Sequence, residues 1–395
     1  MSTVKTLFEK VSKYVDSPRN RHLASLWKPQ LVTARDHWRG TPKLEKVAVT
    51  VEPENPLWAK IIGFNIKDFY TDPDTYLKNT LKINLYRFLE FQDDTPLSKI
   101  IPIWLGAGFE HSFFGLDPVF LPGRSPWIPK TPIIINEQDL DSLNYPDFYR
   151  SGLMPRAHEF FERISRLVHD SDFTVTFPEW ARGPFGLAGA IRGWENLLKD
   201  MITAPDFVHR LMKFFNGSRI RWARERARFL GSKIEKANLY NDEVNVPLLS
   251  PLRYEKFVLP YEKEICDFFG GLLYWHSCGN ISPLLELIRE IPTIDMLHVG
   301  PWTDLPSVIN VFRGTPLEIC LNPLSDVMLA TELEMRSRIE YIMNTCKGNP
   351  FTIRADGIHP AKSVKHDVAQ IKRWLRVARE VVDKQSANKE SLTVK

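Results

Sequence analysis

From residue 100 onward, short apolar runs alternate with amphipathic segments whose apolar positions recur every three or four residues. Each run is rich in branched or aromatic residues and ends in polar residues, Gly or Pro, as strands buried on both faces do. The amphipathic segments 205–215 and 251–260 open with proline, which suits the first turn of a helix. The alternation predicts a parallel sheet covered by helices. The runs are residues 100–105, 173–177, 237–240, 272–275, 296–299, 317–320 and 351–354.

The number of runs favours a closed barrel over an open sheet. An eighth strand is expected either at 46–51 or at the weaker run 131–135. We therefore expect the α/β class, as a (β/α)8 TIM barrel with an N-terminal helical extension. The extension is expected over residues 1–95, packed on a barrel formed by 96–383. The polar residues 384–395 are expected to be a frayed tail.

Composition and charge exclude several classes of protein. The chain has 395 residues, of which 43% are hydrophobic, and this is enough for one large domain. Its net charge of +4 comes from basic and acidic residues spread along the whole chain, so neither nucleic acid nor an anionic membrane is an expected partner. Five arginines between 219 and 228 lie in a helical segment of alternating charge and most simply form a solvated helix face.

The chain also lacks the signals of secreted or membrane proteins. No apolar run reaches the length of a membrane span, and the charged N-terminus does not resemble a signal peptide. Four cysteines are too few for a disulfide framework and suit a reducing compartment. The sequence therefore predicts a cytoplasmic protein.

Ligand-type and acid/base side chains follow the ends of the predicted strands. In a TIM barrel these ends converge at one mouth, where the active site lies. Solvated loops would be richer in Lys and Ser than this set is. Its members are Glu110, His111, Glu179, Arg182, Asp242, Glu243, His276, Cys278, His298, Asp304, Cys320, Asn322, Asp356 and His359.

The most informative of these side chains are His276 and Cys278, at the end of one predicted strand. Residues two apart on a strand point to the same side, and imidazole and thiolate are preferred zinc ligands. On spacing alone, a buried core His and a small packing Cys are favoured over a metal site. Glu243, after the preceding strand, is a candidate fourth ligand or general base. Alternatively, Asp242 or Glu243 caps a helix N-terminus.

Aromatic side chains predict an apolar substrate pocket in the segment 104–115. Gly106 and Gly108 permit close approach of the backbone, and the neighbouring aromatic side chains are candidate walls of a cavity. Such a pocket would suit a small aromatic or cyclic substrate, whereas the alternative is an ordinary hydrophobic core. The candidate wall residues are Phe109, Phe113, Phe114, Trp180 and Trp302.

Four segments carry a resemblance to a known group of enzymes. Residues 250–261, 276–280 (His-Ser-Cys-Gly-Asn), 321–323 and 355–360 resemble the uroporphyrinogen decarboxylase superfamily, nearest its zinc-dependent corrinoid-linked methyltransferases. The resemblance implies zinc bound by the His and Cys of the second segment and by a further Cys near the C-terminus. Here that last position is Asp356, a departure from the pattern.

Asp356 changes the chemistry that the resemblance implies. An oxygen donor makes the site harder than a thiolate-rich one, and such sites suit activation of water or polarisation of a carbonyl or ether oxygen. Alternatively, Asp356 only accepts a structural hydrogen bond. The decarboxylases of the superfamily need no metal and use an Arg-rich N-terminal signature, which residues 1–60 lack. Porphyrinogen decarboxylation is therefore not expected.

Three functions remain open. The first is a methyltransferase that moves a methyl group between a small substrate, such as a methoxylated aromatic compound, and a corrinoid protein. Its metal would be zinc or another divalent ion on His276, Cys278, Asp356 and Glu243, and its substrate would be positioned by Phe109, Glu179, Arg182, Trp302 and the catalytic His111.

The second function is a metal-dependent hydrolase or lyase that acts on a small cyclic or carbonyl substrate without a corrinoid. In that case Glu243 or His359 would move protons. The third is a non-catalytic binding protein, which the many titratable groups at strand ends disfavour. The general frequency of two-fold symmetry favours a homodimer.

Overall fold

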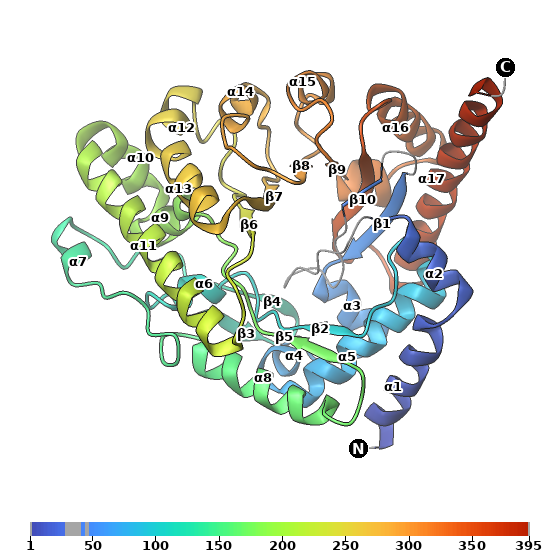
Figure 1. Cartoon of the computed structure of the whole chain (residues 1–395), viewed down its shortest axis with the longest axis horizontal. Coiled ribbons are helices and arrows are strands. Elements are labelled where there is room, and N and C mark those ends of the chain that lie inside the picture. Colours follow the sequence, from blue (N-terminus) through green and yellow to red (C-terminus); the bar gives the residue numbers. More distant parts are fainter. Residues whose placement is uncertain (1, 28–40, 44–46, 394–395) are drawn as a thin grey trace.

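The computed structural model describes residues 2–27, 41–43 and 47–393. Eight parallel strands follow one another around the molecule in chain order (Figure 1). All seven runs predicted after residue 95 are strands, and the eighth is the segment near 46–51, whereas 131–135 forms no strand. The strands are β1 (Ala48–Pro53), β2 (Ile100–Pro102), β5 (Thr174–Thr176), β6 (Ala237–Tyr240), β7 (Leu272–His276), β8 (Leu297–Val299), β9 (Leu317–Leu321) and β10 (Phe351–Ile358).

The sheet curls into a half-barrel rather than a fully paired barrel. Six strands pair in the order β1-β10-β9-β8-β7-β6, and β2 pairs with β5 separately. A single bridge between Arg182 and Tyr240 joins the two sheets. Among the described residues no ladder joins β1 to β2. The predicted α/β class and strand order are confirmed, but the closure of the barrel is incomplete.

Two carboxylates occupy the outer edge of β1, where a neighbouring strand would lie. Asp94 Oδ2 accepts from the Val49 amide at 2.8 Å, and Asp93 Oδ2 accepts from the Val51 amide at 2.9 Å. Asp94 also donates its own amide to the Val49 carbonyl at 2.9 Å. Buried backbone groups need partners, and these bonds stabilise β1 where no ladder with β2 forms.

Helices cover the outer face of the strands (Figure 1). The two predicted proline-led helices begin at Pro205 and Pro251. The helices are α1 (Ser2–Val15), α2 (Pro18–Ser25), α3 (Asn55–Ile62), α4 (Ile66–Thr71), α5 (Pro73–Tyr86), η1 (Arg87–Phe91), α6 (Phe109–Ser112), α7 (Gln138–Asp141), α8 (Met154–Val168), α9 (Pro184–Arg192), α10 (Trp194–Thr203), α11 (Pro205–Leu230), α12 (Pro251–Phe257), α13 (Leu259–Phe269), η2 (Ser282–Leu284), α14 (Leu285–Ile288), α15 (Leu305–Val311), η3 (Pro323–Met328), α16 (Glu332–Thr345) and α17 (Val364–Thr393).

The N-terminal part of the chain contributes to the sheet itself. β1 pairs with β10 from Ala48 to Pro53, so the segment 1–95 supplies one barrel strand as well as the helices before and after it. The domain division at residue 95 stays a prediction, but the barrel sheet includes a strand from before that residue. The tail expected to be frayed continues α17 as a helix to Thr393. Within the described ranges, no helix is long and apolar enough to span a membrane.

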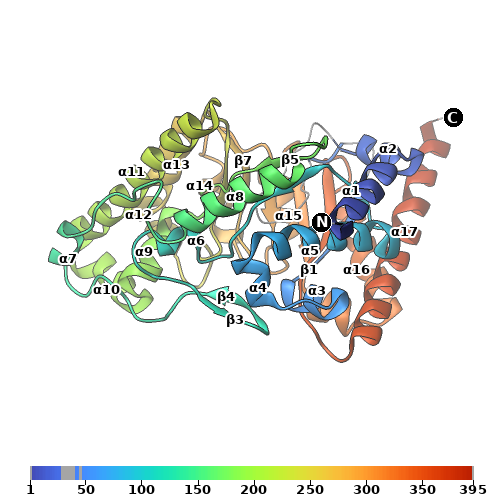
Figure 2. The ribbon, with the colours of Figure 1, turned by 90° about the horizontal axis from the view of Figure 1, so that it is seen from below.

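An antiparallel hairpin, β3 (Val119–Leu121) with β4 (Arg124–Trp127), follows β2 and α6 and lies beside α4 (Figure 2). Gly108 and Gly106 allow this hairpin to pack closely. A Cβ on Gly108 would lie 2.6 Å from Pro118, and Gly106 has a φ of +97° next to Pro126. The prediction that the two glycines permit a close approach is confirmed, although what approaches is the hairpin.

The inner face of the strands is polar. The main hydrophobic core lies between strands and helices, whereas Tyr240, Tyr274 and Met296 form a small separate cluster. Arg354 lies close to two buried carboxylates, 3.8 Å from Glu318 and 3.6 Å from Glu52. Buried charged groups need partners of opposite charge, and these two carboxylates lie near Arg354. The candidate site lies at the carboxyl ends of the same strands.

Candidate active site

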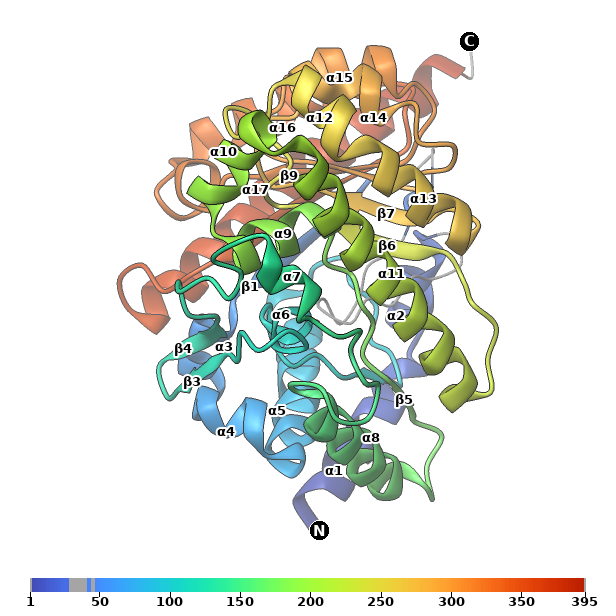
Figure 3. The ribbon, with the colours of Figure 1, turned by 90° about the vertical axis from the view of Figure 1, so that its left-hand side faces the viewer.

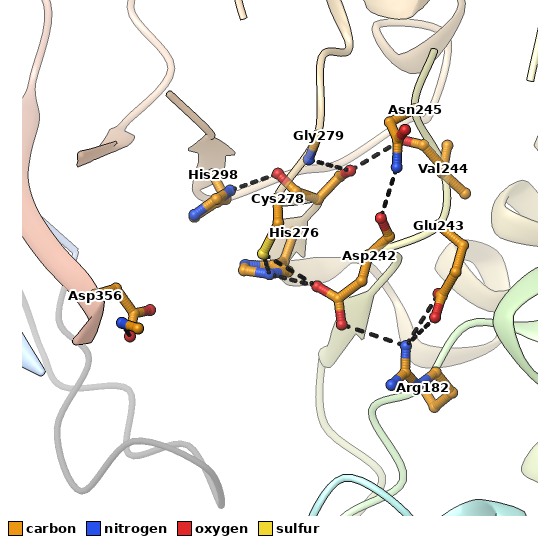
Figure 4. A network of polar contacts seen from close by, with 12 residues as sticks. Arg182, Asp242, Glu243, Val244, Asn245, His276, Cys278, Gly279, His298 and Asp356 are labelled. Carbon is orange, nitrogen blue, oxygen red and sulfur yellow. Dashed lines mark hydrogen bonds and ion pairs between the residues drawn. The ribbon is translucent and has the colours of Figure 1, made fainter. Parts of the chain in front are cut away.

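Three side chains from two adjacent strand ends meet at the mouth of the half-barrel (Figure 4). His276 Nε2 lies 2.8 Å from Asp242 Oδ1 and 3.1 Å from Cys278 Sγ, and Sγ lies 3.3 Å from the same carboxylate oxygen. These ligand atoms all lie within 4.8 Å of one another. One imidazole nitrogen, one sulfur and one carboxylate oxygen so arranged can share hydrogen bonds, and together they could hold a metal ion.

The pairing of β6 with β7 explains why these residues meet. Tyr240 is the register partner of His276, and the Asn241 amide donates to the His276 carbonyl at 2.8 Å. Asp242 therefore leaves β6 directly beside His276. The prediction that His276 and Cys278 lie together is confirmed, with the imidazole buried and the thiol exposed.

Tyr274 and Glu318 fix the orientation of the His276 ring. The Tyr274 hydroxyl donates a hydrogen bond to Glu318 and lies 3.2 Å from His276 Nδ1. Because its proton points to Glu318, the tyrosine oxygen accepts from Nδ1–H, which leaves the Nε2 lone pair for the cluster. Sequence reasoning missed both residues, although Tyr274 stands two positions before His276, on the same face of β7.

Arg182 holds the second oxygen of Asp242. Its Nη1 donates to Asp242 Oδ2 at 3.3 Å and to Glu243 Oε1 at 2.9 Å. Burial raises the pKa of the Glu243 carboxyl, and the facing guanidinium opposes that rise. Asp242 thus presents one oxygen to the cluster and one to Arg182, whereas Glu243 is directed to Arg182 (Figure 4).

Neither Glu243 nor Asp356, both expected as ligands, belongs to the cluster. Glu243 is bound by Arg182, as described above. Asp356 lies near the end of β10, three strands from β7, where Oδ1 accepts from the Gly357 amide at 2.7 Å and Oδ2 lies 3.5 Å from Arg354. The structural interpretation of Asp356 is therefore favoured, and the carboxylate of the cluster is Asp242. Asp242 does not cap a helix either, because α12 begins after the N-cap Ser250.

A cavity of about 140 Å3 lies next to Asp242 and Arg182. Its apolar walls include Phe109, as the sequence predicts, together with Trp104 and Trp127, which were not among the predicted wall residues. Glu110 and Glu179 add carboxyl groups to the lining. The cavity therefore combines flat aromatic walls with a few placed polar groups, as small-molecule sites do.

The two glutamates of the lining have different roles. Glu110 accepts from the amides of Ala181 and Arg182 at 2.9 and 3.1 Å, so it shapes the backbone that carries Arg182. Glu179 is bonded to the Asn238 amide group at 2.7 Å, and its burial raises the pKa of the carboxyl. Glu179 is thus the candidate for a neutral acid facing the pocket.

Several expected site residues lie elsewhere. Burial lowers the pKa of His111 to about 3, and this side chain is not among the described residues that line the cavity. Trp302 is 63% exposed after β8, and His359 is exposed after β10. Phe113 and Phe114 pack into the aromatic core, as the alternative interpretation had it.

Comparison with known proteins identifies the family. The uroporphyrinogen decarboxylase (URO-D) family profile matches residues 102–380. A uroporphyrinogen decarboxylase from Thermodesulfovibrio yellowstonii is 23% identical over 240 residues, which cover 59% of this chain and 66% of that protein, just under two thirds. A methyltransferase from Methanosarcina mazei has a similar fold, with a TM-score of 0.61 and 14% identity over 86% of this chain and 95% of that one. Since the family profile spans well over half of its length, this chain belongs to the uroporphyrinogen decarboxylase (URO-D) family.

Proposed function

We propose that this protein is a zinc-dependent methyltransferase that moves a methyl group between a small aromatic substrate and a corrinoid carried by a partner protein. The observation that carries the proposal is the meeting of Asp242, His276 and Cys278 beside an aromatic-walled cavity. The fold similarity to a methyltransferase and the resemblance around His276 are consistent with it.

The donor set fits a zinc ion. Zinc in proteins is bound by imidazole, thiolate and carboxylate groups, and a catalytic site leaves one position open for substrate. His276 Nε2, Cys278 Sγ and Asp242 Oδ1 supply one donor of each type. The bond from His276 Nδ1 to Tyr274 is the kind of outer contact that metal-binding histidines make. His276, Cys278 and Asp242 are therefore the proposed ligands.

The residues around the donors suit cleavage of a methyl ether. Trp104, Phe109 and Trp127 offer apolar faces to an aromatic ring, and Arg182 places a positive charge at the same end of the cavity as Asp242. A bound zinc ion supplies Lewis acidity, which stabilises the oxygen that leaves. The oxygen would keep the electron pair of the broken carbon–oxygen bond, and the reduced corrinoid of the partner would supply the pair for the new bond to the methyl carbon.

Exposed apolar side chains support a protein partner at the mouth. They follow the carboxyl ends of several strands, and exposed apolar surface commonly marks an interaction site. A corrinoid bound by a partner would have to approach from this side to reach the cavity. The side chains are Trp127, Leu252, Trp302, Leu324 and Leu329.

A metal-dependent hydrolase or lyase is the second candidate. The carboxylate of Asp242 makes the donor set harder than a thiolate-rich one, and such sites also activate water or a carbonyl group. The expected proton carriers argue against it, since Glu243 is held by Arg182 and His359 is exposed away from the lining. We therefore place it second.

Metal analysis and methyl transfer test the proposal together. We expect stoichiometric zinc in the wild-type protein, loss of zinc and of transfer in His276→Ala, and retention of both in the exposed control His359→Ala. Transfer is measured from a panel of methoxyaromatics and methylamines to reduced cobalamin. A zinc-replete protein that transfers no methyl group from any of them would reject the methyltransferase, and cleavage of aryl esters instead would favour the hydrolase.

A further inference from the structure

Two carboxyl groups line the mouth pocket without belonging to the cluster of donors. Glu110 and Glu179 share this cavity of about 140 Å3 with the aromatic walls Trp104, Phe109 and Trp127. Neither glutamate forms an ion pair with the residues that the structure describes, and their hydrogen bonds engage one oxygen of each. The second oxygen of each group is therefore the feature of the pocket that the proposed chemistry leaves unused.

Glu110 presents one such oxygen to the pocket. It lies on the short helix α6, which packs against α9 (Figure 3). Its Oε1 accepts from the amides of Ala181 and Arg182 at 2.9 and 3.1 Å, and the residue as a whole is only 7% exposed. Its Oε2 has no hydrogen bond to the described residues but keeps surface open, since the side chain lines the pocket. An acceptor in this position requires a donor from water or from a ligand.

Glu179 adds an oxygen that can change its role. Its Oε1 accepts from the Asn238 amide group at 2.7 Å, and burial raises the pKa of the carboxyl. When the group is protonated, this bond to Oε1 leaves the proton on Oε2, which then donates. When the group is ionised, Oε2 accepts. A ligand group next to Glu179 is therefore best able to do both.

Two arginines of α11 do not occupy these oxygens. Between β5 and β6 the described residues form one bridge, and the arginines bind carbonyl groups in the remaining gap. Arg226 donates to the carbonyls of residues 177 and 178 at 3.0 and 2.8 Å, and Arg219 donates to the Asn238 carbonyl at 2.8 Å. The predicted solvated face of this helix is therefore wrong for these two side chains, which turn inward. Their charges act on Glu179 only at longer range.

The arginine that lines the pocket is also engaged by acids. Arg182 Nη1 donates to Asp242 Oδ2 at 3.3 Å and to Glu243 Oε1 at 2.9 Å. These two carboxyl groups offset the charge of the guanidinium. The polar side of the pocket thus combines a paired cation with two open carboxyl oxygens, which is an unfavourable setting for a ligand anion.

We propose that the mouth pocket selects an aromatic ring that bears a hydroxyl group, which donates to Glu110 Oε2, and that it disfavours a ring that bears a carboxylate. A hydroxyl that donates to a carboxylate forms a strong hydrogen bond, and it can pair with Glu179 in either protonation state. A ring carboxylate brings only acceptors to face Glu110 Oε2. The inference rests on the proposed function in taking this pocket as the substrate site, and it narrows the substrate to hydroxylated aromatic compounds.

Calorimetric titration of the zinc-replete protein with phenol, toluene and benzoate tests this selectivity. The three probes share one ring, and toluene lacks the hydroxyl whereas benzoate carries acceptors alone. We expect phenol to bind with one-to-one stoichiometry and at least about tenfold more tightly than either of the others. Ala107→Phe, which fills the pocket, should abolish the binding of phenol.

Glu110→Gln reverses the polarity of the open position. The two backbone amides can only donate, so the glutamine keeps its oxygen on them and turns its NH2 group to the pocket. Phenol should then bind about tenfold more weakly or worse, and benzoate more tightly than to the wild-type protein. Glu235→Gln is the matched control, because Glu235 is exposed in the loop before β6 and does not line this pocket.

His276→Ala separates this inference from the proposed function. Absence of zinc or of methyl transfer would reject the proposed function, whereas the preference for phenol should persist in this variant. Circular dichroism verifies the fold of each variant, and if Ala107→Phe does not fold, the pair Glu110→Gln and Glu235→Gln decides. The inference is overturned if phenol binds no better than toluene or benzoate, if Glu110→Gln keeps the wild-type preference, or if the preference disappears in His276→Ala.

Discussion

At the scale of the residue, the main difference between prediction and structure is which carboxylate lies beside His276 and Cys278. Sequence reasoning places Glu243 and Asp356 with His276 and Cys278, whereas Asp242 occupies that position. A pattern of two residues on one strand predicts the His–Cys pair directly. Which carboxylate joins the pair depends on the register between β6 and β7 and on how Arg182 binds the two adjacent acids. The local sequence pattern predicts neither.

A matched pair of variants tests this difference. We expect Asp242→Asn to weaken zinc binding by about tenfold or more, because an amide oxygen carries no charge to offset that of the metal. Asp356→Asn should leave zinc affinity unchanged, since that side chain bonds to Gly357 and lies near Arg354. Both affinities are measured by competition with a chromophoric chelator. The opposite ranking would restore Asp356 as the ligand.

The Tyr274 hydroxyl gives a second prediction at this scale. Removing it in Tyr274→Phe leaves His276 Nδ1 without its acceptor and should weaken zinc binding by about tenfold or more. Tyr254→Phe is the control, because Tyr254 is equally buried but its hydroxyl bonds to Glu262. This control should lose stability without losing zinc affinity. Equal zinc affinities in the two variants would mean that Tyr274 does not orient the ring.

At the scale of the element, Glu262 links α13 to β7 and to the loop after β6. Its carboxyl accepts from the Trp275 indole at 2.9 Å, from the Tyr254 hydroxyl at 2.8 Å and from the Asn241 amide group at 2.8 Å. Burial outweighs these donors and raises the pKa of Glu262 from 4.5 to about 7. Asn241 precedes Asp242, so the position of this helix also affects the loop that carries the site.

The raised pKa of Glu262 predicts the direction of a pH effect on stability. The folded state keeps the proton where the unfolded chain has lost it, so the stabilisation is complete below pH 4.5 and is lost as the pH rises through about 7. The loss amounts to about 3 kcal/mol in the free energy of unfolding, at 1.36 kcal/mol per pKa unit.

Urea unfolding of the metal-free protein across pH 5 to 8 measures this loss. In Glu262→Gln, which cannot ionise, stability should fall much less with rising pH than in the wild-type protein. Glu255→Gln, at an exposed position on α12, is the matched control and should keep the wild-type slope. A Glu262→Gln variant with the unchanged slope would show that another group causes it.

The contrast between β7 and α11 shows which elements a sequence specifies. A buried parallel strand such as β7 needs an apolar run on both faces of the chain, so its position is visible in the pattern. The alternating charges of α11 likewise indicate a helix, but not that Arg219 and Arg226 turn inward. Their direction depends on the gap between β5 and β6, which only the assembled sheet creates.

The same argument applies to the whole molecule. The number and order of the strands could be predicted, because each strand has its own local signal. The incomplete closure could not, since it depends on contacts between segments far apart in the chain, such as those of Asp93 and Asp94 with β1. The hairpin that brings Trp127 to the mouth pocket is likewise placed by packing on Gly108.

The exposed apolar side chains at the mouth lead to a prediction for the molecule as a whole, which rests on the proposed function. If a corrinoid protein docks there, Trp302→Glu and Leu324→Glu should raise the KM for that protein about tenfold, as the loss of a central apolar contact does. Neither change touches the lining of the mouth pocket, so transfer to free cobalamin should keep its wild-type rate.

Leu89→Glu is the control for this experiment, because Leu89 is also exposed but lies on η1, in the segment that leads to the amino end of β2. It should affect neither acceptor. A loss of transfer to free cobalamin in Trp302→Glu would instead assign that side chain to the substrate, as the sequence pattern suggested. An unchanged KM in both mouth variants would contradict docking of the partner at the mouth.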